Sequence, residues 1–212
     1  MLSSLLFALT PVLLGAGLAF LPGASRSLGP LRWVAILAAG FVVFAEMLPE
    51  AWEVLGAPSL ALFAAGLLVP AGLEWAVARS DRPGAEARGE GVGLEMAGAG
   101  LTLHQLADGL QVGAAGVSEV GGPGLILAIA AHTAPLIAVA VLGFVEHSGR
   151  RGALLRAGLL VLATGIGVAV GHSGAGGLSE TMTACLEAGL AGLLLHVLTH
   201  QRPHGHAERP EV

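Results

Sequence analysis

The sequence predicts an all-α fold, a polytopic transmembrane helical bundle of about seven helices. Its 212 residues are 54% hydrophobic and only 12% charged, with a mean hydropathy of +0.78. A soluble domain carries about twice that charged fraction. The apolar residues also gather into segments of about 20, the length that an α-helix needs to cross the hydrocarbon core of a bilayer. A third observation, the placement of the basic residues, orients these segments in the membrane.

The predicted helices follow one another through short joints rich in glycine and proline. They cover residues 4–22, 31–50, 60–78, 95–117, 123–146, 153–171 and 178–199. The first has no basic residue before it, which argues against a cleaved signal peptide. The longest joint, 79–94, is charged and glycine-rich and is predicted to be a flexible cytoplasmic linker. It separates three helices within 1–78 from four within 95–200, which a polar cytoplasmic tail, 201–212, follows.

All ten basic residues are arginines, and each follows an odd-numbered segment. Because cytoplasmic loops are enriched in basic residues, this pattern predicts a plasma or inner membrane protein with its N-terminus outside and its C-terminus in the cytoplasm. The outer loops carry no basic residue, but they do carry Glu50, Glu53, Glu119, His172 and Glu180. A rim of one charge sign would raise the local concentration of cations. The alternative is that these glutamates only solvate helix ends.

Four ionisable residues lie well inside predicted helices, where such groups are costly and each is a functional hypothesis: His104, Asp108, His132 and Glu187. His104 and Asp108 are spaced i, i+4 and share one helix face. An imidazole nitrogen and a carboxylate oxygen one turn apart can hold a divalent ion, and Gln105 could add a neutral oxygen. Counting about 1.5 Å per residue from the helix ends puts all four groups near the bilayer centre. The sequence therefore favours one shared polar site over separately satisfied side chains.

Two further features accompany these residues. Pro135 removes the amide that would bond to the carbonyl of Ala131, beside His132, and such broken backbone is tolerated in membranes where it faces protein or a cavity. His196 lies deep in the last helix and is expected to pair within the bundle. A small cytoplasmic cluster consists of His200, His204 and His206. Metal binding and incidental placement both remain open for that cluster.

Three segments carry a resemblance to a known family. They are Leu48-Pro49-Glu50-Ala51 in the second helix, His104-Gln105-x-x-Asp108-Gly109 in the fourth, and Leu186-Glu187-Ala188-Gly189 with His196 in the last. Together they resemble the ZIP (Zrt/Irt-like protein) family of divalent-metal transporters, whose fourth helix carries a His-Asn-x-x-Asp/Glu-Gly metal motif. The resemblance implies a helical bundle that moves a divalent ion across a membrane.

The chain also departs from that family. Its fifth helix usually reads like His-Glu-x-Pro-His-Glu, whereas residues 132–137 read HTAPLI. Thr133, Leu136 and Ile137 therefore replace the other ligand positions, and the family's eighth helix is missing. The resemblance then implies one metal site at most. Its candidate ligands are His104, Asp108 and His132, with Gln105 and Glu187 second.

The first functional hypothesis is a transporter that moves a divalent metal, with zinc expected ahead of iron or manganese, towards the cytoplasm as its substrate. The second is a non-transporting ZIP-like metal-binding or sensor protein, favoured by the apolar Leu136 and Ile137. The third is a proton or small-solute pathway. The sequence contains no nucleotide-binding loop and no nucleophile triad that would indicate an enzyme. No organic cofactor is expected. The expected partners are the metal ion, the lipid bilayer and a second copy in a homodimer packed through small residues, without nucleic acid.

Overall fold

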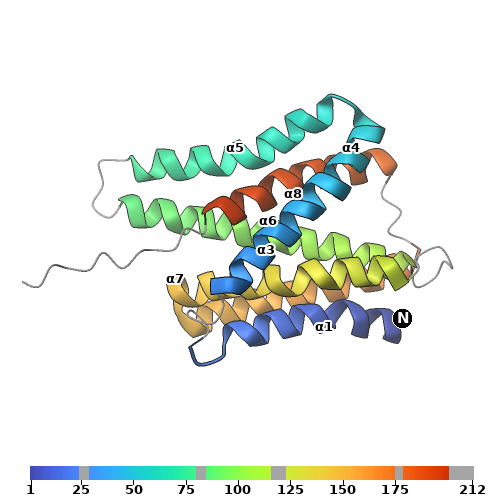
Figure 1. Cartoon of the computed structure of the whole chain (residues 1–212), viewed down its shortest axis with the longest axis horizontal. Coiled ribbons are helices and arrows are strands. Elements are labelled where there is room, and N and C mark those ends of the chain that lie inside the picture. The colour runs from blue at the N-terminus through green and yellow to red at the C-terminus, as the bar shows by residue number, and fades with distance from the viewer. Residues whose placement is uncertain (24–28, 80–84, 116–122, 175–178, 201–212) are drawn as a thin grey trace, which may run out of the picture.

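The computed structural model of the chain describes residues 1–23, 29–79, 85–115, 123–174 and 179–200. Every regular element in these ranges is a helix, which confirms the all-α class (Figure 1). The elements are α1 (Leu2–Ala19), α3 (Gly29–Val42), the π-helix η1 (Val43–Met47), α4 (Leu48–Leu55), α5 (Pro58–Ala78), α6 (Ala85–Ala115), α7 (Pro123–His172) and α8 (Glu180–His200). The predictions for Glu119 and for the tail, 201–212, lie outside the described residues.

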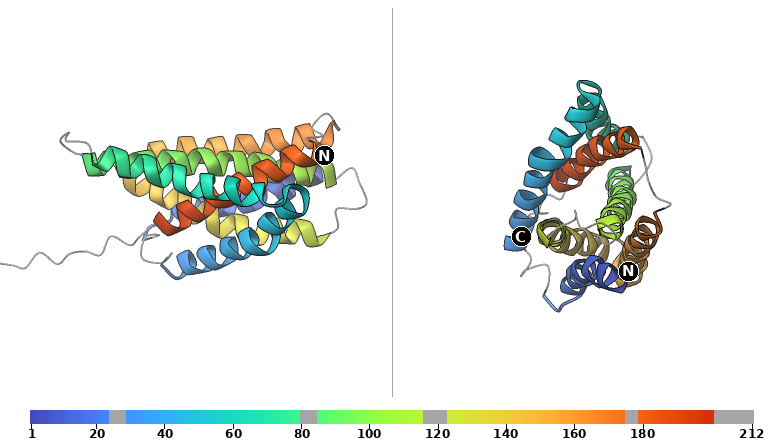
Figure 2. Two further views of the ribbon diagram at one scale, coloured as in Figure 1. Left: turned by 90° about the horizontal axis from the view of Figure 1, so that it is seen from above. Right: turned by 90° about the vertical axis from the view of Figure 1, so that its right-hand side faces the viewer.

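α7 covers both the fifth and the sixth predicted segments. It changes direction at Gly149, whose φ of 71° and ψ of 174° are not helical. Glycine adopts a positive φ without the steric cost that a side chain imposes. Figures 1 and 2 show the two halves of α7 side by side, so the chain turns back at the joint that the sequence predicts.

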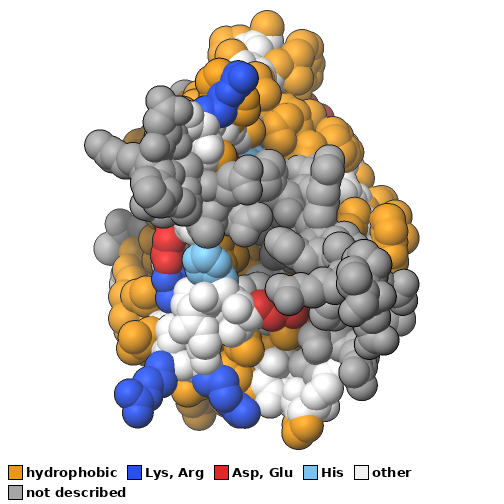
Figure 3. Space-filling view, turned by 90° about the vertical axis from the view of Figure 1, so that its left-hand side faces the viewer, with side chains coloured by type: hydrophobic (Ala, Val, Ile, Leu, Met, Phe, Trp, Pro, Cys, Tyr) orange, Lys and Arg blue, Asp and Glu red, His pale blue; other side chains and the backbone are white. Residues whose placement is uncertain are grey.

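Successive helices run in alternate directions. In Figure 1, α1, α5 and the first half of α7 end at the left, whereas α4, α6 and the second half of α7 end at the right. Arg79 follows α5, and Arg150 and Arg151 follow the turn in α7, so these arginines share the left end. Figure 3 faces that end and shows arginine side chains on it. The arrangement agrees with the predicted sidedness, while the orientation in a membrane stays a prediction.

The interior is organised around α6. One side of α6 packs against α7, and α1 in turn packs against α7. The other side of α6 packs against α5 and α8. The end-on view in Figure 2 shows α6 between these two groups. α3 contacts α7 and α4 contacts α8, so the α3–η1–α4 segment spans both groups. Side chains on α6 can therefore meet residues from either half of the bundle.

Glycine lets α6 and the second half of α7 approach through their backbones. A Cβ at Gly109 or Gly113 of α6 would collide with the α7 backbone, and one at Gly167 or Gly171 of α7 would collide with the α6 backbone. Each pair has the small-xxx-small spacing that allows close helix packing in membranes. These four glycines thus serve close packing at this interface.

The segment α3–η1–α4 is one long helix with a wider turn inside it. The π-turn covers Val43–Met47, directly before Pro49. Proline cannot donate to the carbonyl four residues earlier, and a single π-turn is a common way to relieve such a break inside an α-helix. The helix ends where Gly56 adopts a φ of 64°. The sequence pattern indicated a helix here but not its π-turn.

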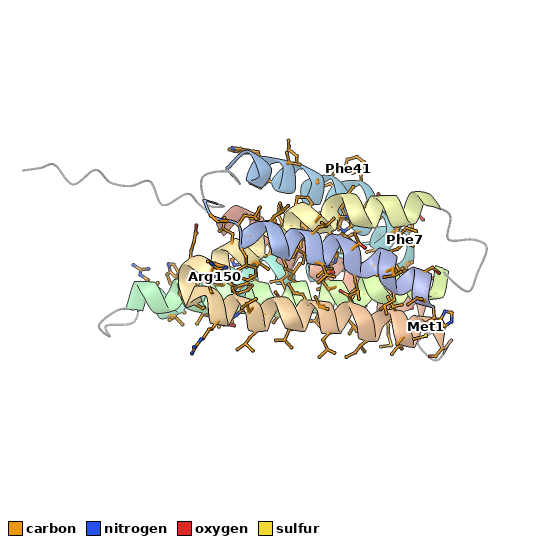
Figure 4. All side chains as sticks on the ribbon, turned by 90° about the horizontal axis from the view of Figure 1, so that it is seen from below. Met1, Phe7, Phe41 and Arg150 are labelled. Atoms are coloured by element: carbon orange, nitrogen blue, oxygen red, sulfur yellow. The ribbon has the colours of Figure 1, made fainter. Side chains whose placement is uncertain are left out.

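The outer surface of the bundle is largely apolar. Phe7 on α1 and Phe41 on α3, labelled in Figure 4, are 57% and 66% exposed. Soluble proteins rarely expose large contiguous apolar surfaces. Within the described residues, three stretches are long and apolar enough to cross a membrane: Leu2–Ala19, Pro58–Ala78 and Ala131–His172. The protein therefore has the character of a membrane protein, and the number of crossings stays a prediction.

α6 differs from the prediction at its start. It begins at Ala85, so most of the predicted linker, 79–94, is helical. The reason lies in packing, because a Cβ at Gly89 would lie 2.9 Å from the carbonyl oxygen of Glu74 on α5, and a Cβ at Gly93 would collide with the Glu74 carboxylate. The glycines that suggested flexibility instead let α6 lie close against α5.

Candidate metal site

The site is formed by one turn of α6 and the first half of α7. His104 and Asp108 lie on the same face of α6, as their i, i+4 spacing predicts, and His132 faces them from α7. The three residues are only 4%, 7% and 4% exposed. Charged and strongly polar side chains are seldom buried this deeply unless they are paired or bind an ion.

Asp108 is the centre of the group. Its Oδ2 lies 3.6 Å from Nε2 of His104 and 3.8 Å from Nε2 of His132. Each residue offers one ligand atom within 4.8 Å of the other two, and the imidazole ring centroids are 5.7 Å apart. Both distances to Asp108 are longer than an ordinary hydrogen bond. The three side chains therefore converge at ion-pair distances that are too long for hydrogen bonds between Oδ2 of Asp108 and either Nε2.

These separations resemble those between ligands of one metal ion. Two ligand atoms each about 2.1 Å from zinc lie roughly 3.4 to 3.6 Å apart at tetrahedral to trigonal angles. The distances of 3.6 and 3.8 Å are close to this range, so small side-chain rotations would bring the atoms to bonding distance. Two imidazoles and one carboxylate are a donor set suited to zinc and to iron(II).

Hydrogen bonding inside the protein leaves part of this site unsatisfied. Among the described residues, Nε2 of His104, Oδ2 of Asp108 and Nε2 of Gln105 are buried and have no hydrogen-bond partner. An unsatisfied buried polar atom costs about 1–3 kcal/mol. The three atoms lie within about one turn of α6. Their clustering favours a site in which they bind a ligand.

Gln105 is the neutral candidate of the predicted set. Its side chain is 1% exposed, and its Oε1 lies 3.2 Å from Oγ1 of Thr164 in the second half of α7. Gln105 therefore faces α7 from the same turn of α6 as His104. Whether its amide reaches an ion at the three ligands stays a prediction.

Glu187 lies in a different place from the other predicted ligands. With Glu50, Glu53, Glu180 and Thr183 it lines an open cleft of about 410 Å³ between α4 and α8. The three-residue group of ligand atoms does not include it. Counting residues along the helix gave its depth but not the direction in which it points, and α8 turns this residue towards α4.

The apolar replacements in the fifth predicted helix are part of the core. Leu136 and Ile137 are 1% and 0% exposed and belong to the main hydrophobic cluster. α1 approaches them closely, since a Cβ at Gly15 would lie 2.9 Å from Cβ of Ile137. The helix continues through Pro135, which is itself buried. These positions thus supply packing beside His132 instead of further ligands.

One buried polar group was only half anticipated. His196 of α8 pairs with Glu74 of α5, with 3.1 Å between Nε2 and Oε1. The side chains are 2% and 9% exposed. The sequence predicted a partner for His196 but did not identify Glu74, which lies near the end of its apolar segment and reads as a boundary charge. Comparing the depths of the two residues in their helices could have found the pair.

Comparisons with models of protein families, with curated proteins and with solved structures gave no match for this chain. The resemblance to the ZIP family accordingly stays a prediction. What supports a functional reading is the geometry of the described residues.

Proposed function

We propose that the protein is a ZIP-like transporter that moves a divalent metal ion, zinc ahead of iron or manganese, across a cell membrane towards the cytoplasm. The ion binds between His104 and Asp108 of α6 and His132 of α7. The observation that carries this proposal is the convergence of two imidazoles on one carboxylate oxygen, at 3.6 and 3.8 Å, inside an apolar bundle. Ionisable groups in such positions mark ion pathways in membrane proteins.

The acidic cleft supports the direction of movement. Its four glutamates lie at the end of the bundle opposite to Arg79, Arg150 and Arg151. A cleft lined by one charge sign concentrates counter-ions. Because basic residues favour the cytoplasmic side, the proposed orientation puts the cleft outside, where it attracts the cation before it reaches the buried ligands.

The test measures metal binding and uptake separately. Purified protein is titrated with Zn²⁺, Fe²⁺ and Mn²⁺, and reconstituted vesicles are assayed for uptake of the same ions. His104→Ala and Asp108→Ala each remove one ligand. Changes outside the ligand shell already cost about 10–100-fold in metal affinity, so loss of a ligand is expected to cost more than about 100-fold and to abolish uptake.

Gln111→Ala is the matched control, because Gln111 continues the same face of α6 two turns after His104 but is exposed. It is expected to leave binding and uptake unchanged. Wild-type affinity and uptake in Asp108→Ala would show that the site is assigned wrongly.

Leu136 and Ile137 favour a second candidate function, a membrane protein that binds the metal without transporting it. Their fully buried side chains sit directly after His132 and Pro135 on α7, where an apolar plug would block movement of an ion. Tight binding by the purified protein without uptake of any divalent ion would favour this second function over transport.

A further inference from the structure

We propose that Thr164 is a positioning residue that turns the Gln105 amide so that its carbonyl oxygen faces the metal ion, and that this contact sets the preference between metals. The inference rests on the proposed metal site at His104, Asp108 and His132. It concerns how Thr164 on the second half of α7, which is not itself one of the three proposed ligands, controls one further ligand on α6.

The Thr164 hydroxyl has two neighbours and only one hydrogen to donate. Its Oγ1 lies 2.9 Å from the carbonyl oxygen of Leu160, four residues earlier, and 3.2 Å from the Gln105 amide oxygen. The bond to Leu160 is shorter, and threonine commonly donates to this carbonyl within a helix. The hydroxyl then presents lone pairs, not a hydrogen, to Gln105.

A lone pair on Thr164 requires a donor from Gln105. A half-turn about the last side-chain bond exchanges the amide nitrogen and oxygen, and the hydrogen-bond partners decide between the two orientations. After that half-turn the Gln105 amide donates to Oγ1 of Thr164. The carbonyl oxygen takes the place of the nitrogen, which is buried and has no partner among the described residues. This one rotation gives the Thr164 oxygen a donor and gives the Gln105 nitrogen a partner.

The freed oxygen lies on the turn that carries the ligands. Gln105 directly follows His104 and precedes Asp108 by three residues. The side chains of Gln105 and Asp108 are therefore neighbours on the helix surface. α6 lies close to Thr164, because Gly109 and Gly167 let the two backbones come into contact there. A carbonyl oxygen held in this position can satisfy its lone pairs by binding the ion.

A neutral oxygen changes which metals the site prefers. Imidazoles suit zinc, whereas carbonyl and carboxylate oxygens suit manganese, and selectivity depends on ligand type and number. Adding the Gln105 oxygen to two nitrogens and one carboxylate raises the coordination number and should favour Mn²⁺ relative to Zn²⁺. Without Thr164 the amide is free to turn and this advantage is lost.

The test uses Thr164→Val, which keeps the shape and removes the hydroxyl, and Thr164→Ser, which restores it. In titrations of the full-length protein, Thr164→Val is expected to weaken Mn²⁺ binding by about 10-fold and Zn²⁺ binding by less. Thr164→Ser should restore both affinities. Bound Co²⁺ should absorb visible light more strongly in Thr164→Val, because its coordination number falls. Thr102→Val is the control, since Thr102 makes the same backbone bond on α6, to Gly98, at 2.7 Å.

A double-mutant cycle isolates the contact. If Thr164 acts through Gln105, Thr164→Val has no further effect on metal binding in a Gln105→Ala background. Equal losses for Zn²⁺ and Mn²⁺, no loss in Thr164→Val, or independent effects of the two substitutions would overturn the inference while leaving the metal site standing. If the wild type binds no divalent ion, both this inference and the proposed function fail, so the two failures are told apart.

Discussion

Two buried groups of ionisable side chains lie in this bundle, and they are built differently. In the pair of Glu74 and His196, a nitrogen and an oxygen are 3.1 Å apart and bond directly. In the group of His104, Asp108 and His132, the corresponding distances are 3.6 and 3.8 Å. In the pair, the two side chains form a hydrogen bond with each other. In the group, Nε2 of His104 and Oδ2 of Asp108 have no hydrogen-bond partner among the described residues, so a metal ion could bind them. The comparison teaches that burial of charge alone does not mark an ion site, and that the spacing of the atoms must be considered too.

The two groups also differ in what α6 contributes to them. Gly93 leaves room for the Glu74 carboxylate, because any side chain there would collide with it. α6 thus closes over the pair without adding a polar atom from that position. At the group of three, α6 itself supplies two of the three side chains, His104 and Asp108. We infer that the pair joins α5 to α8 and that the group binds an ion.

The largest expected effect on stability is at the pair. Glu74→Ala leaves His196 buried without its carboxylate, and breaking one half of a buried pair costs about 3–5 kcal/mol. Chemical unfolding in detergent micelles measures the loss. The exposed pair Glu95 and Arg156 is the control, with side chains 58% and 24% exposed, and Glu95→Ala should change the free energy of unfolding by less than about 1 kcal/mol. A loss no greater than that of the control would mean that the pair does not hold α5 to α8.

The next effect separates binding from stability. Asp108→Asn is expected to weaken Zn²⁺ binding by more than about 100-fold, which is about 2.7 kcal/mol. In metal-free protein it should leave stability unchanged or slightly raised, because a buried charge is removed and Oδ2 of Asp108 has no hydrogen-bond partner to lose. Titration with Zn²⁺ and unfolding in a chelator measure the two quantities. A large loss of stability without metal would make Asp108 a structural residue like Glu74.

A smaller effect is expected at the glycine that accommodates the pair. Gly93→Ala forces the Glu74 carboxylate or α6 to shift, and overpacking of this kind costs about 1–3 kcal/mol. Gly158→Ala is the control, since a Cβ there meets nothing within 4 Å and alanine favours the helix. Unfolding of both variants in the same detergent gives the comparison. Equal stabilities of the two variants would show that α6 is not packed tightly against the pair. Zn²⁺ binding should be unchanged in both variants.

Much of the fold follows from the sequence because hydrophobic length and the joints between segments are local properties. The i, i+4 spacing of His104 and Asp108 puts them on one face, and the depth of His132 brings it to their level. The structure unites these three residues. The spacing of the candidate ligands along and between helices can therefore be predicted from the sequence.

Directions around the helix axes were not readable in the same way. Glu187 has a suitable depth by residue counting but lines the cleft beside α4, because the packing of α8 decides which face is inside. The helical start of α6 was also missed, since Gly89 and Gly93 resemble a flexible linker until the partner that they accommodate, Glu74, is known. Both differences between the structure and the sequence pattern concern contacts between segments distant in the chain, which local patterns do not report.

The pair and the group also differ in when they can form during synthesis. Glu74 and His196 are separated by 122 residues, so their bond must wait until α8 has left the ribosome. The group of three needs only α6 and the first half of α7, which are adjacent in the chain. Closing long loops is slow compared with closing short ones, and chains begin to fold from the N-terminal side during synthesis. The proposed metal ligands can therefore meet before α8 has been made, whereas the contact between α5 and α8 can complete the bundle only afterwards.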